Sequence, residues 1–262
     1  MVATEVDQLS PRELLALYDA QIRSDPPPEA GITYERTGGV LRGTGAFNFI
    51  FHSDLDETTA DAAIAAQARH FSDPPAEIQW KVYGHDLPAD IGERLVAAGF
   101  GLEEPETFMV LRLSDYRPGA AMPAGLEIQR ATDLSVIEDY VVVANAVFGG
   151  DESWRIGPFS SRLGDPTLAV YVAYADGNPV CSGRLEMPMG KSFASIWGGG
   201  TLQDFRGKGI YRALVDIRAR EAIRRGFRYL TVDARDTSRP ILEKLGFVPL
   251  THIRDYVLNK SL

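Results

Sequence analysis

Residues 196–211 read Ile-Trp-Gly-Gly-Gly-Thr-Leu-Gln-Asp-Phe-Arg-Gly-Lys-Gly-Ile-Tyr, and the rest of the chain is organised around them. An apolar, strand-like run passes through three glycines into a second glycine-bearing turn, and a helical pattern starts at Ile210. The first amides of a helix lack partners in their own helix, and the helix dipole adds partial positive charge there. A strand that leads through a glycine turn into a helix therefore predicts an anion-binding site.

The turn itself supplies both space and charge. Gly207 and Gly209 have no Cβ, so a phosphate can approach their amides closely. Arg206 and Lys208 add full positive charges at the same rim. These residues predict a cradle for a diphosphate, and an exposed basic loop is the alternative that they leave open.

The segments after the turn follow a characteristic order. The helix ends near Gly226, and residues 229–234 have the pattern of a buried strand. Ser238-Arg239-Pro240 opens a short helix that stops at Leu245-Gly246-Phe247. In this order the motifs resemble the GNAT superfamily of acyl-CoA-dependent N-acyltransferases. The phosphate turn of that family reads Arg/Gln-x-x-Gly-x-Gly/Ala, and its last helix commonly ends in Leu-Gly-Phe.

The resemblance covers about Leu126 to the C-terminus and implies transfer of an acyl group from acetyl-CoA (coenzyme A) to an amine. It implies that amides in the turn hold the pyrophosphate and that main-chain groups before the turn pair with the pantetheine arm. Gly198-Gly199-Gly200 predicts a β-bulge that opens the sheet for this arm, and a bulge without a ligand is the alternative. The cofactor-binding residues that it implies are Thr201, Leu202, Arg206, Gly207, Lys208, Gly209, Ile210, Tyr211 and Arg212.

Arg212 stands one turn into the helix and is a candidate for the 3′-phosphate of the cofactor. A solvated helix face is the favoured interpretation for it and for Arg218, Arg220, Arg224 and Arg225.

Two positions depart from the family pattern. Tyr211 stands where the family has Gly or Ala, so its side chain decides how the pyrophosphate is placed. Leu242 stands where the family often has a tyrosine that protonates the leaving thiolate. Ser238, Tyr256 or water are the alternatives for that acid.

Two carboxylates are candidates for the base that deprotonates the amine. Glu186 is the first, because it lies near the end of the strand before Trp197, where the family often places such a carboxylate. Asp233, on the facing strand, is the second. A satisfied or solvated carboxylate is the alternative for each.

The composition excludes several other classes of protein. The net charge of −9 over 262 residues argues against general binding to nucleic acid or to anionic membranes. No apolar run approaches a membrane span, and residues 1–5 lack the layout of a signal peptide. Cys181 is the only cysteine, and the four histidines show no metal-ligand spacing. We expect a cytoplasmic protein without a metal site.

The first half of the chain repeats the order of the second. Residues 78–83 resemble a strand, a helix runs from Pro88 to Ala98, Gly99-Phe100 ends it, and a strand follows at 107–111. At the position of the phosphate turn, however, residues 53–57 read Ser-Asp-Leu-Asp-Glu. Three carboxylates suit a helix start but repel a diphosphate, so this half is predicted not to bind coenzyme A.

The predicted fold class is α/β (α+β), with two tandem GNAT-like domains. Each has a mixed, mostly antiparallel sheet flanked by helices, and the layout is similar to that of mycothiol synthase. The predicted boundaries are a degenerate domain at 1–117, a Pro/Gly/Ala linker at 118–125 and an acetyltransferase domain at 126–262.

Two rival functions remain at this stage. One is a non-catalytic acyl-CoA-binding module, because the usual tyrosine is absent. The other is DNA recognition by the arginine-rich segment 206–228, which the net negative charge of the chain disfavours. The expected partners are a small-molecule amine, no nucleic acid and no membrane, with the chain a monomer or homodimer.

Overall fold

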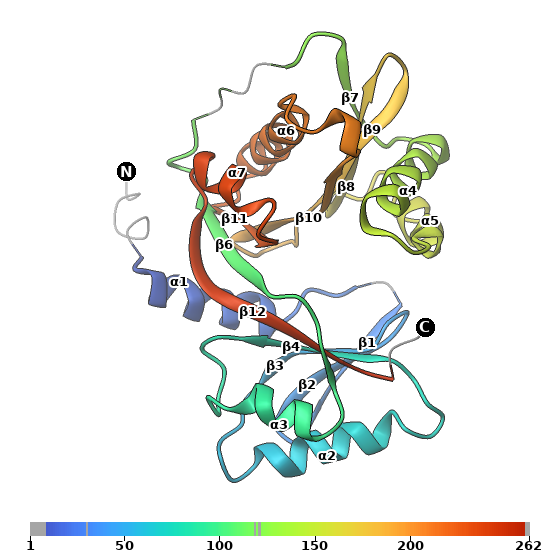
Figure 1. The fold of residues 1–262 in the computed structure, drawn as a ribbon. Coiled ribbons are helices and arrows are strands. Elements are labelled where there is room, and N and C mark those ends of the chain that lie inside the picture. The colour runs from blue at the N-terminus through green and yellow to red at the C-terminus, as the bar shows by residue number, and fades with distance from the viewer. Residues whose placement is uncertain (1–8, 30, 118, 120–121, 260–262) are drawn as a thin grey trace. The chain divides into compact units, whose positions relative to one another are not determined.

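The computed structural model describes residues 9–29, 31–117, 119 and 122–259, and the chain forms two compact units (Figure 1). The first unit comprises residues 1–109, 233–239 and 249–262, and the second comprises residues 110–232 and 240–248. Three strands, β6 (Glu106–Arg112), β11 (Tyr229–Ala234) and β12 (Val248–Leu258), contribute residues to both units. Among the described residues, no helix combines the length and the apolar character needed to cross a membrane.

The first unit is built on a sheet in the order β1-β2-β3-β4-β12, in which only β3 and β4 run parallel. Its elements are α1 (Pro11–Tyr18), a π-helical turn (Asp19–Arg23), β1 (Ile32–Thr37), β2 (Val40–Gly45), β3 (Phe49–Ser53), α2 (Ala60–His70), β4 (Ile78–Tyr83), α3 (Ile91–Ala97) and β5 (Gly101–Leu102). Ser10 caps α1 in a capping box with Glu13. The core lies between the sheet and the helices α2 and α3, and it includes Ile50, Ile64, Ile78, Trp80 and Leu95.

The second unit has the sheet order β11-β10-β9-β8-β7, in which only β10 and β11 run parallel. Its elements are β7 (Leu126–Arg130), α4 (Leu134–Phe148), a 3₁₀ turn (Ser153–Arg155), α5 (Ile156–Ser160), β8 (Leu168–Ala175), β9 (Asn178–Glu186), β10 (Phe193–Thr201), a second 3₁₀ turn (Gln203–Phe205), α6 (Ile210–Arg224), β11 (Tyr229–Ala234) and α7 (Arg239–Lys244). Helices α4 and α5 lie on one side of β8, β9 and β10, and α6 lies on the other (Figure 1).

Helix α4 shows why this sheet is covered on that side. Asp133 caps it by accepting from the amides of Ser135 and Val136. Its apolar residues recur at helical spacing, and they bury one face against the strands. The buried members are Val136, Ile137, Tyr140, Val141, Val143 and Ala144.

The predicted fold class, a mixed and mostly antiparallel sheet with flanking helices, is confirmed. The compact units depart from the predicted domain boundaries in three stretches, because residues 110–117 belong to the second unit and residues 233–239 and 249–262 belong to the first. There β12 pairs antiparallel with β4, from Ile253–Tyr83 to Leu258–Ile78. The sequence of a strand does not show which other strand it pairs with. A boundary predicted from composition therefore grouped β12 with the segments that precede it in the chain. Residues 118, 120 and 121 of the predicted linker lie outside the described residues.

Candidate functional site

Strand β10 separates from β11 halfway along its length. Their parallel register runs from Phe193–Tyr229 to Ser195–Thr231, and β10 then continues to Thr201. On the other side, its pairing with β9 shifts register between Trp197 and Gly200. The predicted bulge is therefore confirmed. Within the described part of the chain, β10 beyond Ser195 offers an edge without a β11 partner.

The three glycines of this bulge are required by close packing on both faces. A Cβ on Gly198 would lie 2.3 Å from the Tyr140 hydroxyl on α4, and one on Gly199 would lie 2.9 Å from the Tyr211 ring on α6. A Cβ on Gly200 would lie 2.6 Å from a methyl group of Val147. Helix packing alone thus accounts for these glycines, and the open edge is a consequence of the bulge they form.

The turn that follows presents unbonded amides. Gly207 and Gly209 have φ of +75° and +81°, a backbone conformation that glycine adopts without strain. Gly209 is the N-cap of α6, and the first hydrogen bond of that helix runs from the amide of Ala213 to the Gly209 oxygen at 3.0 Å. No described residue accepts a hydrogen bond from the amides of residues 207–212. Space is available too, since a Cβ on Gly207 would meet no atom within 4 Å.

Positive side chains surround these amides. Arg206, Lys208 and Arg212 are exposed at the start of α6. Arg206 is held in place by a hydrogen bond from its Nε to the Thr201 oxygen at 3.1 Å, and Lys208 lies 4.8 Å from the centre of the Phe205 ring. The helix dipole, the free amides and three cations therefore act in the same direction, toward an anion.

The side chain of Tyr211 points away from this turn. Its ring lies against Gly199 on the α6 side of the bulge, where burial raises the pKa of the hydroxyl. The hydroxyl is therefore protonated at neutral pH, and the ring leaves the amides of the turn uncovered. The other predicted cofactor-binding residues lie at the end of β10 and in the first turn of α6, with Thr201 and Ile210 buried and Leu202 half-buried.

Glu186 lies at the end of β9 on the α4 side of the sheet. The Nε of Arg184 donates to its Oε1 at 2.8 Å, and its side chain remains 38% exposed. Arg184 lies beside Trp197, with 5.6 Å between the guanidinium carbon and the ring centre. Burial alone would lower the pKa of Arg184, but the Glu186 carboxylate and the Tyr140 hydroxyl raise it. Glu186 is thus an accessible carboxylate two residues along β9 from Arg184, which lies opposite Trp197 at the bulge.

Arg218 was expected on a solvated helix face, and that expectation is wrong. The side chain is fully buried between α6 and the sheet. Its Nε donates to the Leu214 oxygen at 3.1 Å and its Nη1 to the Arg184 oxygen at 3.2 Å. A Cβ on Gly183 would lie 2.7 Å from this Nη1, so the missing side chain makes the room. The sequence signal was therefore a glycine in β9, far from the helix itself.

The other catalytic candidates lie in the first unit. Asp233 accepts a hydrogen bond from Lys81 Nζ at 2.6 Å, and both side chains are buried. Tyr256 is part of the core, with its hydroxyl against Gly92. Ser238 precedes α7 and donates to the Arg235 oxygen at 3.1 Å. Their catalytic roles stay predictions, and only Glu186 shares a unit with the turn.

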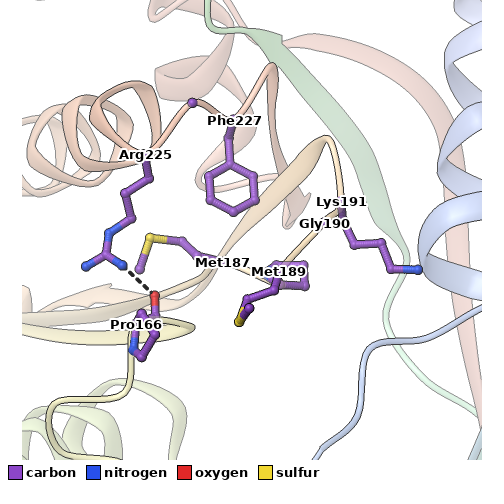
Figure 2. Close-up of a pocket in the computed structure, with 9 residues that line it drawn as sticks. Pro166, Met187, Met189, Gly190, Lys191, Arg225 and Phe227 are labelled. Carbon is purple, nitrogen blue, oxygen red and sulfur yellow. Dashed lines mark hydrogen bonds between the residues drawn. The ribbon is translucent and has the colours of Figure 1, made fainter.

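A shallow pocket of about 400 Å³ also occurs in the second unit, at the other end of the parallel strands (Figure 2). It is lined by Met187, Met189 and Lys191, which precede β10, and by Phe227, which precedes β11. The turn follows the carboxyl end of β10. Since ligands of parallel strand pairs bind at the carboxyl ends, this pocket is not part of the candidate site.

Three comparisons place these features among known proteins. Residues 135–247 match the model of the acetyltransferase (GNAT) family. No curated protein matches the sequence.

Solved structures match over most of the chain. A GCN5-related N-acetyltransferase from Kribbella flavida superposes with a TM-score of 0.71 at 13% identity, covering 88% of this chain and 91% of that one. A conserved protein of unknown function from Staphylococcus epidermidis superposes with a TM-score of 0.69 at 15% identity, covering 98% and 100%. A tandem GNAT protein from the clavulanic acid biosynthesis pathway gives a TM-score of 0.62 at 14% identity, covering 90% and 86%. At these identities the similarity establishes a shared fold.

Proposed function

The chain belongs to the GNAT superfamily through its residues 135–247, and from this premise we propose that it transfers an acyl group from acetyl-CoA to the amine of a small molecule. The family supports acyl transfer in general. The donor, the amine and direct attack in a ternary complex are the specific parts of the proposal.

One observation carries the proposal: the amides of residues 207–212 have no acceptor among the described residues and stand among exposed cations. A pyrophosphate supplies the oxygen acceptors and negative charge that this arrangement lacks. Charge-assisted hydrogen bonds each contribute about 1.5–3 kcal/mol, so each one strengthens the binding of an anion by roughly 10- to 100-fold. The edge of β10 beyond Ser195 offers main-chain groups to the pantetheine arm, and Thr201 and Leu202 lie at its end.

The residues of the site account for most of the chemistry. When bound, acetyl-CoA supplies an activated acyl group. The amine must be neutral to attack it, and Glu186, an accessible carboxylate, takes the proton directly or through one water. The new C–N bond forms and the C–S bond breaks, which releases the thiolate of coenzyme A. The thiolate takes its proton from water, because the side chain at the usual acid position, Leu242, is apolar and buried.

The first unit is proposed to be a degenerate copy without a cofactor site. At the start of α2 the carboxylate of Asp56 accepts hydrogen bonds from the amides of Thr58 and Thr59, each at 2.9 Å. Hydrogen bonds from the hydroxyls of Thr58 and Thr59, together with those from the two amides, lower the pKa of Asp56 to about 2, so the carboxylate stays negative at neutral pH. An anion would meet a bound carboxylate there in place of free amides. We expect the chain to act in the cytoplasm.

A second candidate function is a non-catalytic acyl-CoA-binding module, favoured by the buried Leu242. Incubation with acetyl-CoA and a panel of amines, with free thiol as the readout, separates the two. The proposal predicts amine-dependent thiol release that disappears in Gly209→Asp. Tight acetyl-CoA binding without thiol release from any amine would favour the module, and no binding at all would contradict both.

A further inference from the structure

Arg184 and the hydroxyl of Tyr140 converge on Gly198, in the bulge of β10. A Cβ on Gly198 would lie 3.4 Å from Arg184 Nη1 and 2.3 Å from the Tyr140 hydroxyl. Gly198 has φ of +57°, which favours glycine, and its missing Cβ leaves room for both groups. The Arg184 side chain is 15% exposed, its Nε donates to Glu186, and the guanidinium also forms a hydrogen bond with the Tyr140 hydroxyl. The remaining Nη hydrogens of such an arginine can bind a carboxylate through charge-assisted hydrogen bonds.

A second guanidinium lies directly beneath the same point of the sheet. Arg218 comes from α6, which packs on the opposite face of the sheet from α4, and it donates from Nη1 to the backbone oxygen of Arg184. It has no exposed surface, and its Nη2 has no hydrogen-bond partner. In the part of the chain that the structure describes, no carboxylate forms an ion pair with it. Burial lowers its pKa, although an arginine keeps its charge at neutral pH.

The charges at the bulge therefore do not balance. Arg184 and Arg218 contribute two positive charges, and Glu186 is the one carboxylate among the described residues that pairs with either of them. A buried charge without a counter-charge is costly, and the cost falls when an anion comes close. The thioester end of acetyl-CoA is neutral, so the missing negative charge has to come from the other substrate.

The arrangement also separates the two ends of that substrate. Glu186, at 38% exposure, is the accessible carboxylate for an ammonium group, and the Nη side of Arg184 lies toward the bulge. The two groups are two residues apart on β9 and hence on the same face of the sheet. The ring of Trp197 lies beside Arg184 and provides a flat apolar wall for what lies between the ends.

We propose that the acceptor is a zwitterionic amine of the amino acid type, with its ammonium group beside Glu186 and its anionic group on Arg184. Arg218 acts from below as a positioning residue, because it holds the backbone of Arg184 and strengthens the positive potential at the bulge. This inference rests on the proposed function, since it names the class of acceptor that the same site takes.

The first test compares acceptors of equal size that differ in one charge. Thiol release from acetyl-CoA is measured with amino acids, with the corresponding amino acid amides, and with phosphoethanolamine set against ethanolamine. Faster turnover of the carboxylate or phosphate members, by roughly 10- to 100-fold in kcat/KM, is the expected result for a charge-assisted contact. Equal or faster turnover of the neutral members would overturn the inference while the acyltransferase function stood. No turnover of any amine would count against the proposed function itself.

The second test replaces Arg184 with lysine, which keeps the charge but loses the paired donors. Affinity for a carboxylate acceptor is followed by the fluorescence of Trp197 in the presence of coenzyme A, and the Trp197→Phe variant shows which signal belongs to that ring. The expected result is a roughly tenfold weaker affinity for the amino acid and an unchanged affinity for its amide. Equal weakening of both would show that Arg184 serves the fold alone and would overturn the inference. Melting curves of each variant identify any loss of folding.

Discussion

The start of α6 and the start of α2 differ in what accepts hydrogen bonds from their backbone amides. Both helices follow a strand and expose amides that need acceptors. Before α2 the chain supplies its own acceptor, the carboxylate of Asp56, which bonds to the amides of Thr58 and Thr59. Before α6 it supplies two glycines, two cations and no acceptor. Where a carboxylate of the chain accepts from the amides, the hydrogen bonds stabilise the fold. Where the amides have no acceptor and lie among cationic side chains, they can bind an anion.

The strands that lead to the two sites resemble each other. β10 shifts register against β9 and separates from β11 after Ser195, and β3 shifts register against β2 and separates from β4 after Ile50, so the two sites differ in their amides. An extended ligand needs both features, the free amides and the free edge. Only the second unit shows the two together in the described residues, which is why the proposed function is assigned to it.

Replacement of Gly209 by aspartate is the most severe test of this contrast. It places a side chain on a residue with φ of +81° and a negative charge among the amides of the cradle. The dissociation constant for acetyl-CoA is expected to rise by roughly 1,000-fold, since two or more charge-assisted hydrogen bonds are lost. Calorimetry measures it directly.

Gly226→Asp is the matched control for that change. Gly226 stands at the other end of α6 with φ of +82°, and a Cβ there would meet no atom within 4 Å. The backbone strain is the same, about 1 kcal/mol in each case. Acetyl-CoA affinity should be unchanged in Gly226→Asp. If both variants lose affinity equally, the loss reports on folding and the cradle is misplaced.

Replacement of Glu186 by glutamine sharpens the contrast at the level of chemistry. The amide cannot accept the proton of the ammonium group, so kcat is expected to fall about 100-fold. Acetyl-CoA affinity should stay as in the unaltered chain, because Glu186 lies outside the turn. Steady-state thiol release and calorimetry give the two quantities, and full activity in this variant would remove Glu186 as the base.

Loss of one rim charge should have a smaller effect. Lys208→Ala removes an exposed cation beside the amides, and a roughly three- to tenfold weaker acetyl-CoA affinity is expected. The difference should shrink as salt is added, because exposed charges are screened. Arg224→Ala is the control, since Arg224 is exposed at the far end of α6 and pairs with Glu221. An equal loss of acetyl-CoA affinity in both variants would show that the cofactor is attracted by the overall positive charge of α6 and not by a defined site at residues 206–212.

The capped helix start offers the mildest test. Asp56→Ala removes the acceptor from the amides of Thr58 and Thr59, in the turn just before α2, so a small decrease in melting temperature is expected, with acetyl-CoA affinity unchanged. The pKa of Asp56 is about 2 in the folded chain, below the value near 3.9 of an unfolded aspartate. Its contribution is therefore fully present above about pH 4 and is lost as the pH falls toward 2. Pairs of melting curves across this range should converge for the two chains, and a constant difference would contradict the capping role.

Most of the helices and strands could be predicted from local patterns in the sequence. The capping box at Ser10 marks the start of α1, and strands such as β4, β8 and β11 follow from their high content of β-branched, aromatic and other apolar residues. The bulge followed from three consecutive glycines. Strand β2 was not predicted, because its residues Val-Leu-Arg-Gly-Thr-Gly lack alternation and contain two glycines.

The errors came from contacts between distant residues. Burial of Arg218 depends on the space left by Gly183 and by the bulge, so the sequence of α6 alone indicated an ordinary charged face. The assignment of β12 depends on its pairing with β4. The pairing of Lys81 with Asp233 likewise joins residues far apart in the chain and uses a carboxylate that the sequence offered as a base. A site read from one chain segment was therefore easier to predict than one assembled from several.

The crystal structure of the chain with acetyl-CoA bound tests the central claim most directly. The account predicts phosphate oxygens within about 3 Å of amide nitrogens between Gly207 and Arg212. It also predicts the pantetheine arm along β10 between Ser195 and Thr201. A pyrophosphate bound elsewhere, with these amides facing solvent or with Tyr211 in the path of the arm, would contradict it.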